Sequence, residues 1–277
     1  GTLYFLLPTS LIKIKTHSDI RKFLLNNTAI HQIDLYDNRF DGVFTDFFSL
    51  KLTLNHVPEQ AYVVINGENQ IDIRLSPRDI LSANIVLEKM NLLDESIMRK
   101  MEAARHDDLK HSQWALGIVT GDNKNKVKKK KEPGLEPVYS GKQVMPFSLG
   151  KESAYIMYAP DNFQQCAKTE YFRAPEKLIY RFIAKYPIVA YDDKQCLCLN
   201  SANILIPEVD SIAVKSVAAL LNSTLYHFYY TKKFSDIKVL KGNLQTLPFP
   251  RLTPVQNKEL SDLVTSFKSD DYSEAHQ

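Results

Sequence analysis

Residues 2–8 read TLYFLLP, a short and continuous apolar run that ends at a proline. A run of this kind is typical of a strand buried in a sheet. Apolar side chains recur at helical spacing over residues 20–24, and residues 30–36 and 47–54 read as two further strands, the last with alternating apolar side chains. A strand, a helix and more strands in this order predict the trailing edge of a doubly wound α/β sheet.

The rest of the first part is expected to be a hairpin and a helical connector. Residues 62–65 and 71–73 flank Asn66-Gly67, which is a strong two-residue turn signal. A helix is predicted to begin near Ser76-Pro77, and residues 94–104 form another helical pattern.

From Trp114 the chain changes character, because short apolar runs alternate with Gly, Pro, Asp and Asn. This pattern predicts a β-rich domain. Two helices are expected within it, at residues 175–185 and at residues 212–232, and the second carries one apolar stripe.

Composition narrows the class of protein. With 277 residues and 44% hydrophobic content, the chain is expected to form two domains. Its apolar stretches are shorter than the roughly 20 residues that span a bilayer. No secretory leader is recognisable, so a cytoplasmic protein without a membrane partner is expected. Of the three cysteines, Cys196 and Cys198 would point to one face of a strand. Reduced thiols are therefore predicted, and no metal site.

The charge of the chain is concentrated in one segment. The net charge is only +3, yet residues 124–131 include six lysines, directly after the turn-like sequence TGDN at residues 120–123. A flexible basic loop is predicted here. Such a run is most often a solvated loop, so the lysines alone do not define a function.

No complete reaction centre is recognisable. The sequence has no Gly-rich phosphate loop, no His-Glu-x-x-His pair and no Gly-x-Ser-x-Gly elbow. Asp34 and Asp37 near Arg39 only faintly suggest a metal-dependent nuclease. No catalytic residue and no metal ligand is therefore predicted.

A series of short motifs carries a resemblance to a known family. In the first part these are residues 1–11 (GTLYFLLPTSL), 19–25 (DIRKFLL), 30–35 (IHQIDL) and 40–45 (FDGVFT). They resemble the stretch that follows the catalytic tetrapeptide in DNA adenine-N6 methyltransferases of type II restriction-modification systems. In the second part, the motifs resemble those of the TaqI-like C-terminal specificity domain, which is the target recognition domain: residues 117–121 (GIVTG), 137–142 (PVYSGK), 187–191 (PIVAY), 221–223 (LNS) and 244–248 (LQTLP).

The resemblance implies a fold and a domain order. The expected fold class is α/β and α+β: a C-terminal remnant of a Rossmann-like methyltransferase sheet, followed by a β-rich mixed target recognition domain. The expected bounds are residues 1–75 for the methyltransferase part, 76–110 for a helical connector, 111–255 for the TaqI-like domain and 256–277 for a C-terminal helix or tail.

The resemblance also implies what this chain lacks. Members of the family bind S-adenosylmethionine through a Gly-containing loop and hold a flipped adenine with an Asn-Pro-Pro-Tyr type motif. Neither motif occurs in this sequence. We therefore expect no cofactor in this chain and S-adenosylmethionine in the complete enzyme. The catalytic methyltransferase portion is expected in the same full-length chain or in a separate subunit, and the fragment alone is expected to be inactive.

The expected partner is double-stranded DNA, held by phosphate contacts and read at its base edges. Asn125 and Gln143 are further polar candidates for base contacts. The predicted DNA-binding residues are Thr120, Asn123, Lys124, Lys126, Lys128, Lys129, Lys130, Lys131, Lys142, Arg173, Lys232, Lys233, Lys238, Lys241 and Asn243. The resemblance also places Phe40 and Phe44 near the flipped base.

Two alternatives stay open. The chain could be a methyltransferase subunit whose active site is completed by another chain along the exposed edge of residues 2–8. It could also be an interaction module whose lysines bind acidic surfaces other than nucleic acid.

Overall fold

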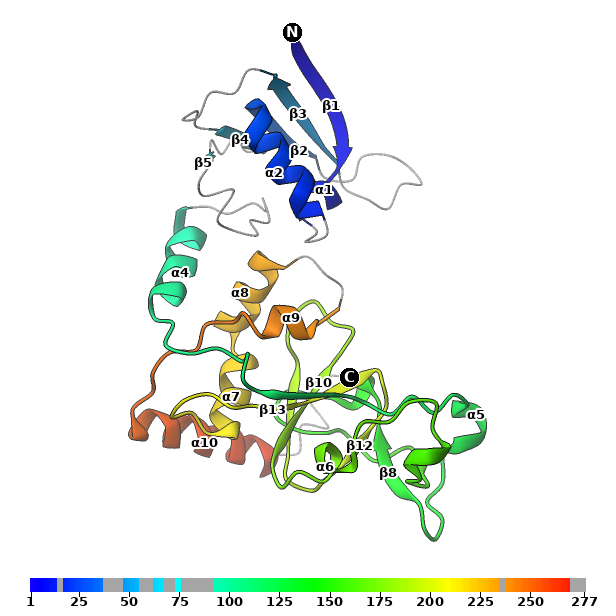
Figure 1. Ribbon diagram of the computed structural model, residues 1–277. Coiled ribbons are helices and arrows are strands. Elements are labelled where there is room, and N and C mark those ends of the chain that lie inside the picture. The colour runs from blue at the N-terminus through cyan, green and yellow to red at the C-terminus, as the bar shows by residue number, and fades with distance from the viewer. Residues whose placement is uncertain are drawn as a thin grey trace. The chain divides into compact units, whose positions relative to one another are not determined.

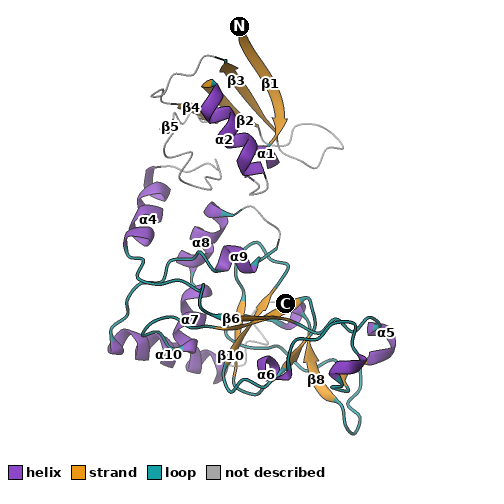
Figure 2. Ribbon diagram, in the orientation of Figure 1, coloured by secondary structure: helices purple, strands orange, loops and turns teal. Residues whose placement is uncertain are grey.

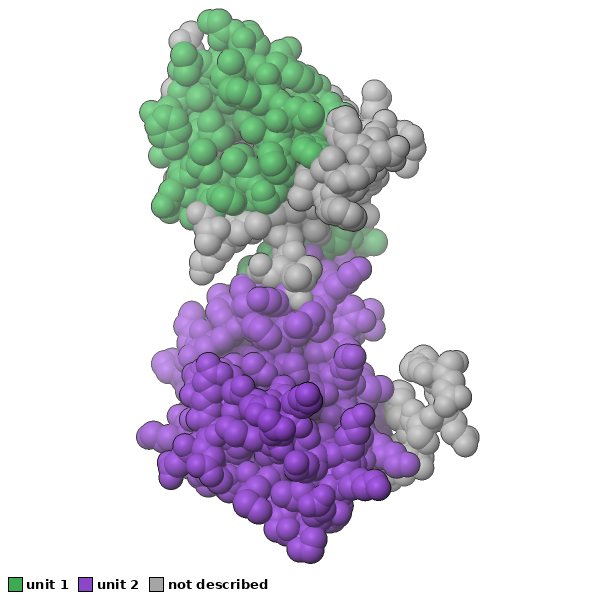
Figure 3. Space-filling model, turned by 90° about the vertical axis from the view of Figure 1, so that its right-hand side faces the viewer, with its two compact units in different colours: residues 1–99, 232–235 green, residues 100–231, 236–277 purple. Residues whose placement is uncertain are grey.

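The computed structural model describes residues 1–13, 17–36, 47–54, 62–66, 73–75, 92–234 and 238–269. The chain divides into two compact units, which Figure 3 colours separately. Unit 1 comprises residues 1–99 and 232–235, and unit 2 comprises residues 100–231 and 236–277. The division at residue 99 falls within the predicted connector.

Unit 1 is built on a mixed sheet whose described strands follow the order β1-β3-β2-β4-β5 (Figure 1). Strand β3 is antiparallel to both of its neighbours, so β1 and β2 run parallel to each other, and β4 is parallel to β2. The elements are β1 (Thr2–Pro8), α1 (Ser10–Lys13), α2 (Ser18–Asn27), β2 (Ala29–Tyr36), β3 (Phe47–Thr53), β4 (Tyr62–Asn66) and β5 (Ile73–Leu75).

The strands predicted at residues 2–8, 30–36, 47–54 and 62–65 and the helix predicted around residues 20–24 are confirmed, and the strand predicted at residues 71–73 is β5 at residues 73–75. The expected burial of residues 2–8 is wrong: among the described strands β1 pairs only with β3, and its side chains from Leu3 to Leu6 are 43–57% exposed. In β3, Phe48, Leu50 and Leu52 are buried, as their alternation indicates. Strands β4 and β5 form an antiparallel pair, while the turn at residues 67–72 lies outside the described residues. The helix expected near Ser76 lies outside them as well.

Helices α4 (Leu92–Ala103) and α8 (Thr224–Lys233) include residues of both units. The described residues of unit 2 otherwise form two sheets with strand orders β11-β10-β13-β6 and β12-β8-β9-β7, together with several helices (Figure 2). Its other elements are β6 (Gln113–Leu116), α5 (Asn123–Lys126), β7 (Val127–Lys128), β8 (Glu136–Tyr139), η2 (Gly141–Gln143), β9 (Tyr155–Ile156), η3 (Pro160–Asn162), α6 (Thr169–Phe172), β10 (Lys177–Arg181), β11 (Val189–Asp192), β12 (Leu197–Cys198), β13 (Ala202–Ile206), α7 (Val214–Leu221), α9 (Lys241–Leu244) and α10 (Pro254–Ser269). This mixture of sheets and helices agrees with the mixed domain predicted for this part of the chain.

Two of the helix predictions in unit 2 need correction. The helix predicted at residues 175–185 is wrong, because strand β10 occupies residues Lys177–Arg181 between β11 and β13. A central strand is buried on both faces and loses the period-2 signal that would distinguish it from a helix. The helix predicted at residues 212–232 is two helices, α7 and α8, which are separated at Asn222-Ser223.

The Leu-Asn-Ser motif at residues 221–223 lies at the break between α7 and α8 and has a structural role there. The Asn222 side chain accepts a hydrogen bond from the Val189 amide at 3.0 Å and donates one to the Val189 carbonyl at 2.8 Å. This half-buried amide side chain thereby satisfies one backbone donor and one backbone acceptor of β11.

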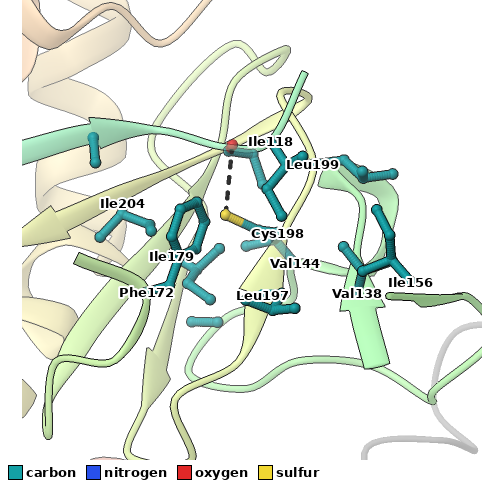
Figure 4. Packing of buried hydrophobic residues seen from close by; sticks show 13 residues of the cluster. Ile118, Val138, Val144, Ile156, Phe172, Ile179, Leu197, Cys198, Leu199 and Ile204 are labelled. Atoms are coloured by element: carbon teal, nitrogen blue, oxygen red, sulfur yellow. Dashed lines mark hydrogen bonds between the residues drawn. The ribbon is translucent and has the colours of Figure 1, made fainter. Parts of the chain in front are cut away.

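The core of unit 2 lies between its two sheets. Ile118, Val144 and Phe172 are fully buried in this cluster, together with residues of β8, β10, β12 and β13 (Figure 4). The Cys198 thiol donates to the Ala202 carbonyl at 3.8 Å. Burial raises the pKa of the Cys198 thiol to about 12, so this cysteine is a neutral core residue at physiological pH.

Two glycines of the sequence motifs, Gly117 and Gly141, lie in close contact with the backbone of residues 199–202. A Cβ atom at Gly117 would lie 2.4 Å from the carbonyl oxygens of Leu199 and Ala202. A Cβ atom at Gly141 would lie 2.3 Å from the carbonyl oxygen of Ser201. Both glycines therefore pack against the turn between β12 and β13, and any larger residue would displace that turn.

We predict that Gly117→Ala lowers the free energy of unfolding of unit 2 by about 2–3 kcal/mol, because the added methyl group overpacks a backbone contact. The matched control is Gly242→Ala, since nothing lies within 4 Å of a Cβ atom at that helical glycine. Urea unfolding followed by the fluorescence of Trp114, the single tryptophan, measures both variants. Equal midpoints for Gly117→Ala and the parent chain would contradict this role.

Candidate nucleic-acid interface

The basic segment of residues 120–131 is partly folded. Its first half forms α5, where the Asp122 carboxylate caps the helix by accepting from the Asn125 amide at 3.1 Å. Its second half enters the two-residue strand β7, which pairs with β9. The prediction of a wholly flexible loop is therefore wrong for residues 123–128.

Five lysines of this segment are exposed and form no ion pair with any residue that the structure describes: Lys124, Lys128, Lys129, Lys130 and Lys131. We call them the lysine ladder. Asp122 is the one acidic residue in the sequence of the segment, which therefore has a clear positive excess. Unpaired ammonium groups of this kind are available to phosphate oxygens.

Three other predicted residues of the segment have internal partners. The Lys126 ammonium donates to the Thr120 carbonyl at 2.8 Å and also to the Asn162 carbonyl. Thr120 is buried, and its hydroxyl donates to the Asn123 side chain at 2.6 Å. These contacts shape the loop, whereas the lysine ladder lies on its outside.

The basic segment is joined to a second loop that is distant in the sequence. Val119 and Gln165 exchange backbone hydrogen bonds of 2.9 and 3.1 Å as an antiparallel bridge. The Lys126 contact to Asn162 adds a further connection. Residues 119–126 and 160–166 thus form one structure, which we call the loop pair.

The remaining predicted residues of unit 2 differ in their surroundings. Arg173 lies over the Tyr158 ring, 5.0 Å from its centre, and pairs with Glu136 at 2.8 Å. Gln143 serves in the capping box of η2, whereas the neighbouring Lys142 is exposed. Asn243 is buried, with its side-chain amide 3.4 Å from the Tyr230 hydroxyl.

The second lysine group, predicted around residues 232–241, is divided between the two units. Lys232 forms an ion pair with Asp94 at 2.9 Å within unit 1, which also contains Lys233. Lys238 lies over the Phe182 ring at 5.5 Å, and Lys241 is the exposed first residue of α9. Phe40 and Phe44 lie outside the described residues.

A metal site would need several ligating side chains close together among the described residues. They contain no group of three His, Cys, Asp or Glu side chains placed to hold a metal ion. Asp34, the described member of the weakly suggested nuclease cluster, accepts hydrogen bonds from Tyr4, Ser49 and Gln32 across the sheet of unit 1. No described helix has the length and apolar character needed to cross a bilayer.

Comparison with known families defines the class of this domain. Residues 136–249 match the family model of the TaqI-like C-terminal specificity domain. The match contains four of the five motifs on which the resemblance of the second part rests, and it confirms that resemblance. A curated relative is the type II methyltransferase M.VspI of Vibrio sp. (strain 343), 28% identical over 152 residues. That alignment covers 52% of this chain and 36% of the relative.

Solved structures of restriction-modification enzymes have a similar fold. The type IIL enzyme MmeI, solved in complex with DNA, matches 99% of this chain with a TM-score of 0.58 and 11% identity. The type ISP enzyme LlaBIII, solved bound to DNA, matches 97% with a TM-score of 0.50 and 8% identity. This chain covers 43% of the MmeI chain and 25% of the LlaBIII chain, so it spans less than half of either.

Proposed function

We propose that this chain is the sequence-specific DNA recognition module of a restriction-modification DNA adenine-N6 methyltransferase. The observation that carries the proposal is the specificity-domain match over residues 136–249, next to a lysine ladder that forms no ion pair with the described residues. The ladder supplies phosphate contacts that hold the duplex in register, and polar side chains of unit 2 supply base contacts.

Unit 1, in this proposal, is the C-terminal part of a Rossmann-like methyltransferase sheet. Its support is topological: β1 and β2 are parallel and are connected through α2, as in a doubly wound sheet. Phe40 and Phe44 would lie near the flipped base, and the domain bounds at residues 75, 110 and 255 belong to the same proposal.

S-adenosylmethionine is assigned to the complete enzyme. The assignment is supported by the sequence, which has no Gly-rich phosphate loop, and by the passage of β1 into α1 through the buried Thr9. The chain alone is therefore proposed to bind DNA without transferring a methyl group.

A binding competition tests the proposed function. The full chain is titrated with a duplex pool of randomised sequence and with heparin at matched charge, and the bound duplexes are sequenced. The proposal expects binding of duplex DNA and enrichment of a short sequence motif. Equal preference for heparin and DNA, with no enriched motif, would instead favour the general polyanion-binding module.

A second candidate is a methyltransferase subunit completed by another chain. It is favoured by β1, which pairs only with β3 among the described strands and exposes Leu3, Tyr4, Phe5 and Leu6 by 43–57%. An apolar edge strand of this kind normally has a neighbour. Adding a candidate catalytic subunit and assaying methyl transfer to duplex DNA distinguishes this alternative from a recognition module within one longer chain.

A further inference from the structure

Reading a base edge requires donor and acceptor groups that the fold has not already used. Three of the amide side chains predicted to contact bases make hydrogen bonds within the domain instead. Asn123 accepts from Thr120, Asn125 donates to Asp122, and Gln143 donates to Lys151. These three residues serve the shape of the domain.

Gln164 and Gln165 have the free groups that those residues lack. Both side chains are exposed, and neither makes a hydrogen bond within the part of the chain that the structure describes. They belong to the loop pair, directly opposite the basic segment. The same small structure therefore carries unused amides and part of the lysine ladder.

The fold fixes the backbone of these two glutamines. Phe163 before them and Cys166 after them pack against the core of unit 2. The Gln165 backbone is held by Val119 at both its amide and its carbonyl group. The pair is thus anchored on both sides, which lowers the entropy lost when the side chains engage a ligand.

Gly121 provides a further constraint on Gln164. Its φ angle of +76° is in the left-handed region, and a Cβ atom there would lie 3.1 Å from the Cβ of Gln164. Glycine is favoured at Gly121 on both counts. The Thr120-Gly121 turn thereby leaves room for Gln164 beside the start of the basic segment.

We propose that Gln164 and Gln165 are specificity-determining residues that read base edges of the DNA in the major groove, with adenine as the preferred base. A glutamine amide can accept from the N6 amino group of adenine while donating to N7, a bidentate pairing that other bases do not offer. Lys124, three residues after Gly121, supplies a phosphate contact nearby in sequence. This inference rests on the proposed function.

The test repeats the selection from randomised duplexes with the full chain carrying Gln164→Ala and Gln165→Ala together. At one or two positions where the parent chain selects adenine, the discrimination of about 5- to 150-fold expected for a bidentate pair should fall towards one. Affinity for duplexes that lack the motif should be unchanged. Gln113→Ala, at an exposed glutamine of β6, is the matched control and should enrich the parental motif.

A second variant makes the result directional. Gln164→Glu keeps an acceptor and loses the amide donor, so the preference at the Gln164 position should move from adenine towards cytosine, whose N4 amino group can donate to a carboxylate. Unchanged urea midpoints followed by Trp114 fluorescence show that these exposed substitutions leave the fold intact.

The inference is overturned if the double alanine variant enriches the same motif as the parent chain and discriminates adenine from the other bases to the same extent. It is also overturned if that variant loses affinity equally for all duplexes, since that is the signature of a phosphate contact. Failure of the proposed function looks different, because the parent chain itself would then enrich no motif.

Discussion

Replacement of Lys177 by methionine is expected to lower the free energy of unfolding of unit 2 by about 3–5 kcal/mol, which is the usual cost of breaking a buried ion pair from one side. The Lys177 ammonium lies 2.5 Å from the Asp192 carboxylate and donates to the Phe172 carbonyl at 2.7 Å. The two charged side chains are 0% and 2% exposed, so water cannot replace either partner.

The carboxylate left behind is what makes this variant costly. Asp192 also accepts hydrogen bonds from the backbone amides of Lys194 at 3.0 Å and Cys196 at 2.9 Å. Without Lys177, its negative charge stays buried against β10 with no cation. Because the same carboxylate holds the turn into β12, we expect the loss of the pair to loosen that turn as well.

Urea unfolding followed by Trp114 fluorescence measures the effect, since the Trp114 ring contacts Tyr180 of β10 at a centroid distance of 6.0 Å. Lys168→Met is the control, because that lysine is 78% exposed and its ion pair should contribute little. The double variant Lys177→Met with Asp192→Asn should recover much of the loss, because no net charge stays buried. Equal urea midpoints for Lys177→Met and Lys168→Met would refute the stabilising role of the Lys177–Asp192 ion pair.

The second large effect is expected in DNA binding. Replacing the five residues of the lysine ladder with glutamine should weaken duplex binding at about 50 mM salt by at least about two to three orders of magnitude, because about five phosphate contacts and their counterion release are lost. The fold should be unaffected, since these side chains are exposed and make no ion pair with a described residue. Fluorescence anisotropy with a labelled duplex measures the change.

A variant with the same change in charge separates a local contact from a general electrostatic attraction. Its five substitutions to glutamine are at exposed lysines outside the basic segment: Lys110, Lys151, Lys168, Lys185 and Lys258. If the ladder contacts phosphate directly, this control should lose much less affinity than the ladder variant. Equal losses would show that only net charge matters.

The sequence predicted those elements whose apolar pattern is set by one sheet face. The alternation in β3 is an example, because Phe48, Leu50 and Leu52 on one face are buried apolar residues, whereas Lys51 and Thr53 on the other face are polar and only partly buried. The strand β10 was predicted as a helix, since residues 177–180 are all buried and carry no period-2 pattern. The position of the break at Asn222 depends on a contact with Val189, 33 residues away, which no local rule reports.

The candidate DNA-binding surface could also be predicted only in part from the sequence. The run of lysines is visible in the sequence itself, so the lysine ladder could be found without a structure. The internal use of Lys126 and Thr120 could not, because it depends on Asn162 and on the folded turn. Gln164 and Gln165 have no sequence signal of their own. Their relation to the basic segment arises only from the pairing of Val119 with Gln165.

The most direct test of the account is a salt titration of duplex binding by the unmodified full chain. If the lysine ladder holds phosphate groups, raising the salt concentration from about 50 to 200 mM should weaken binding by about two to three orders of magnitude, and the ladder variant should show a nearly flat dependence. No binding at 50 mM salt, or an affinity of the parent chain that does not change with salt, would contradict recognition of DNA by this surface.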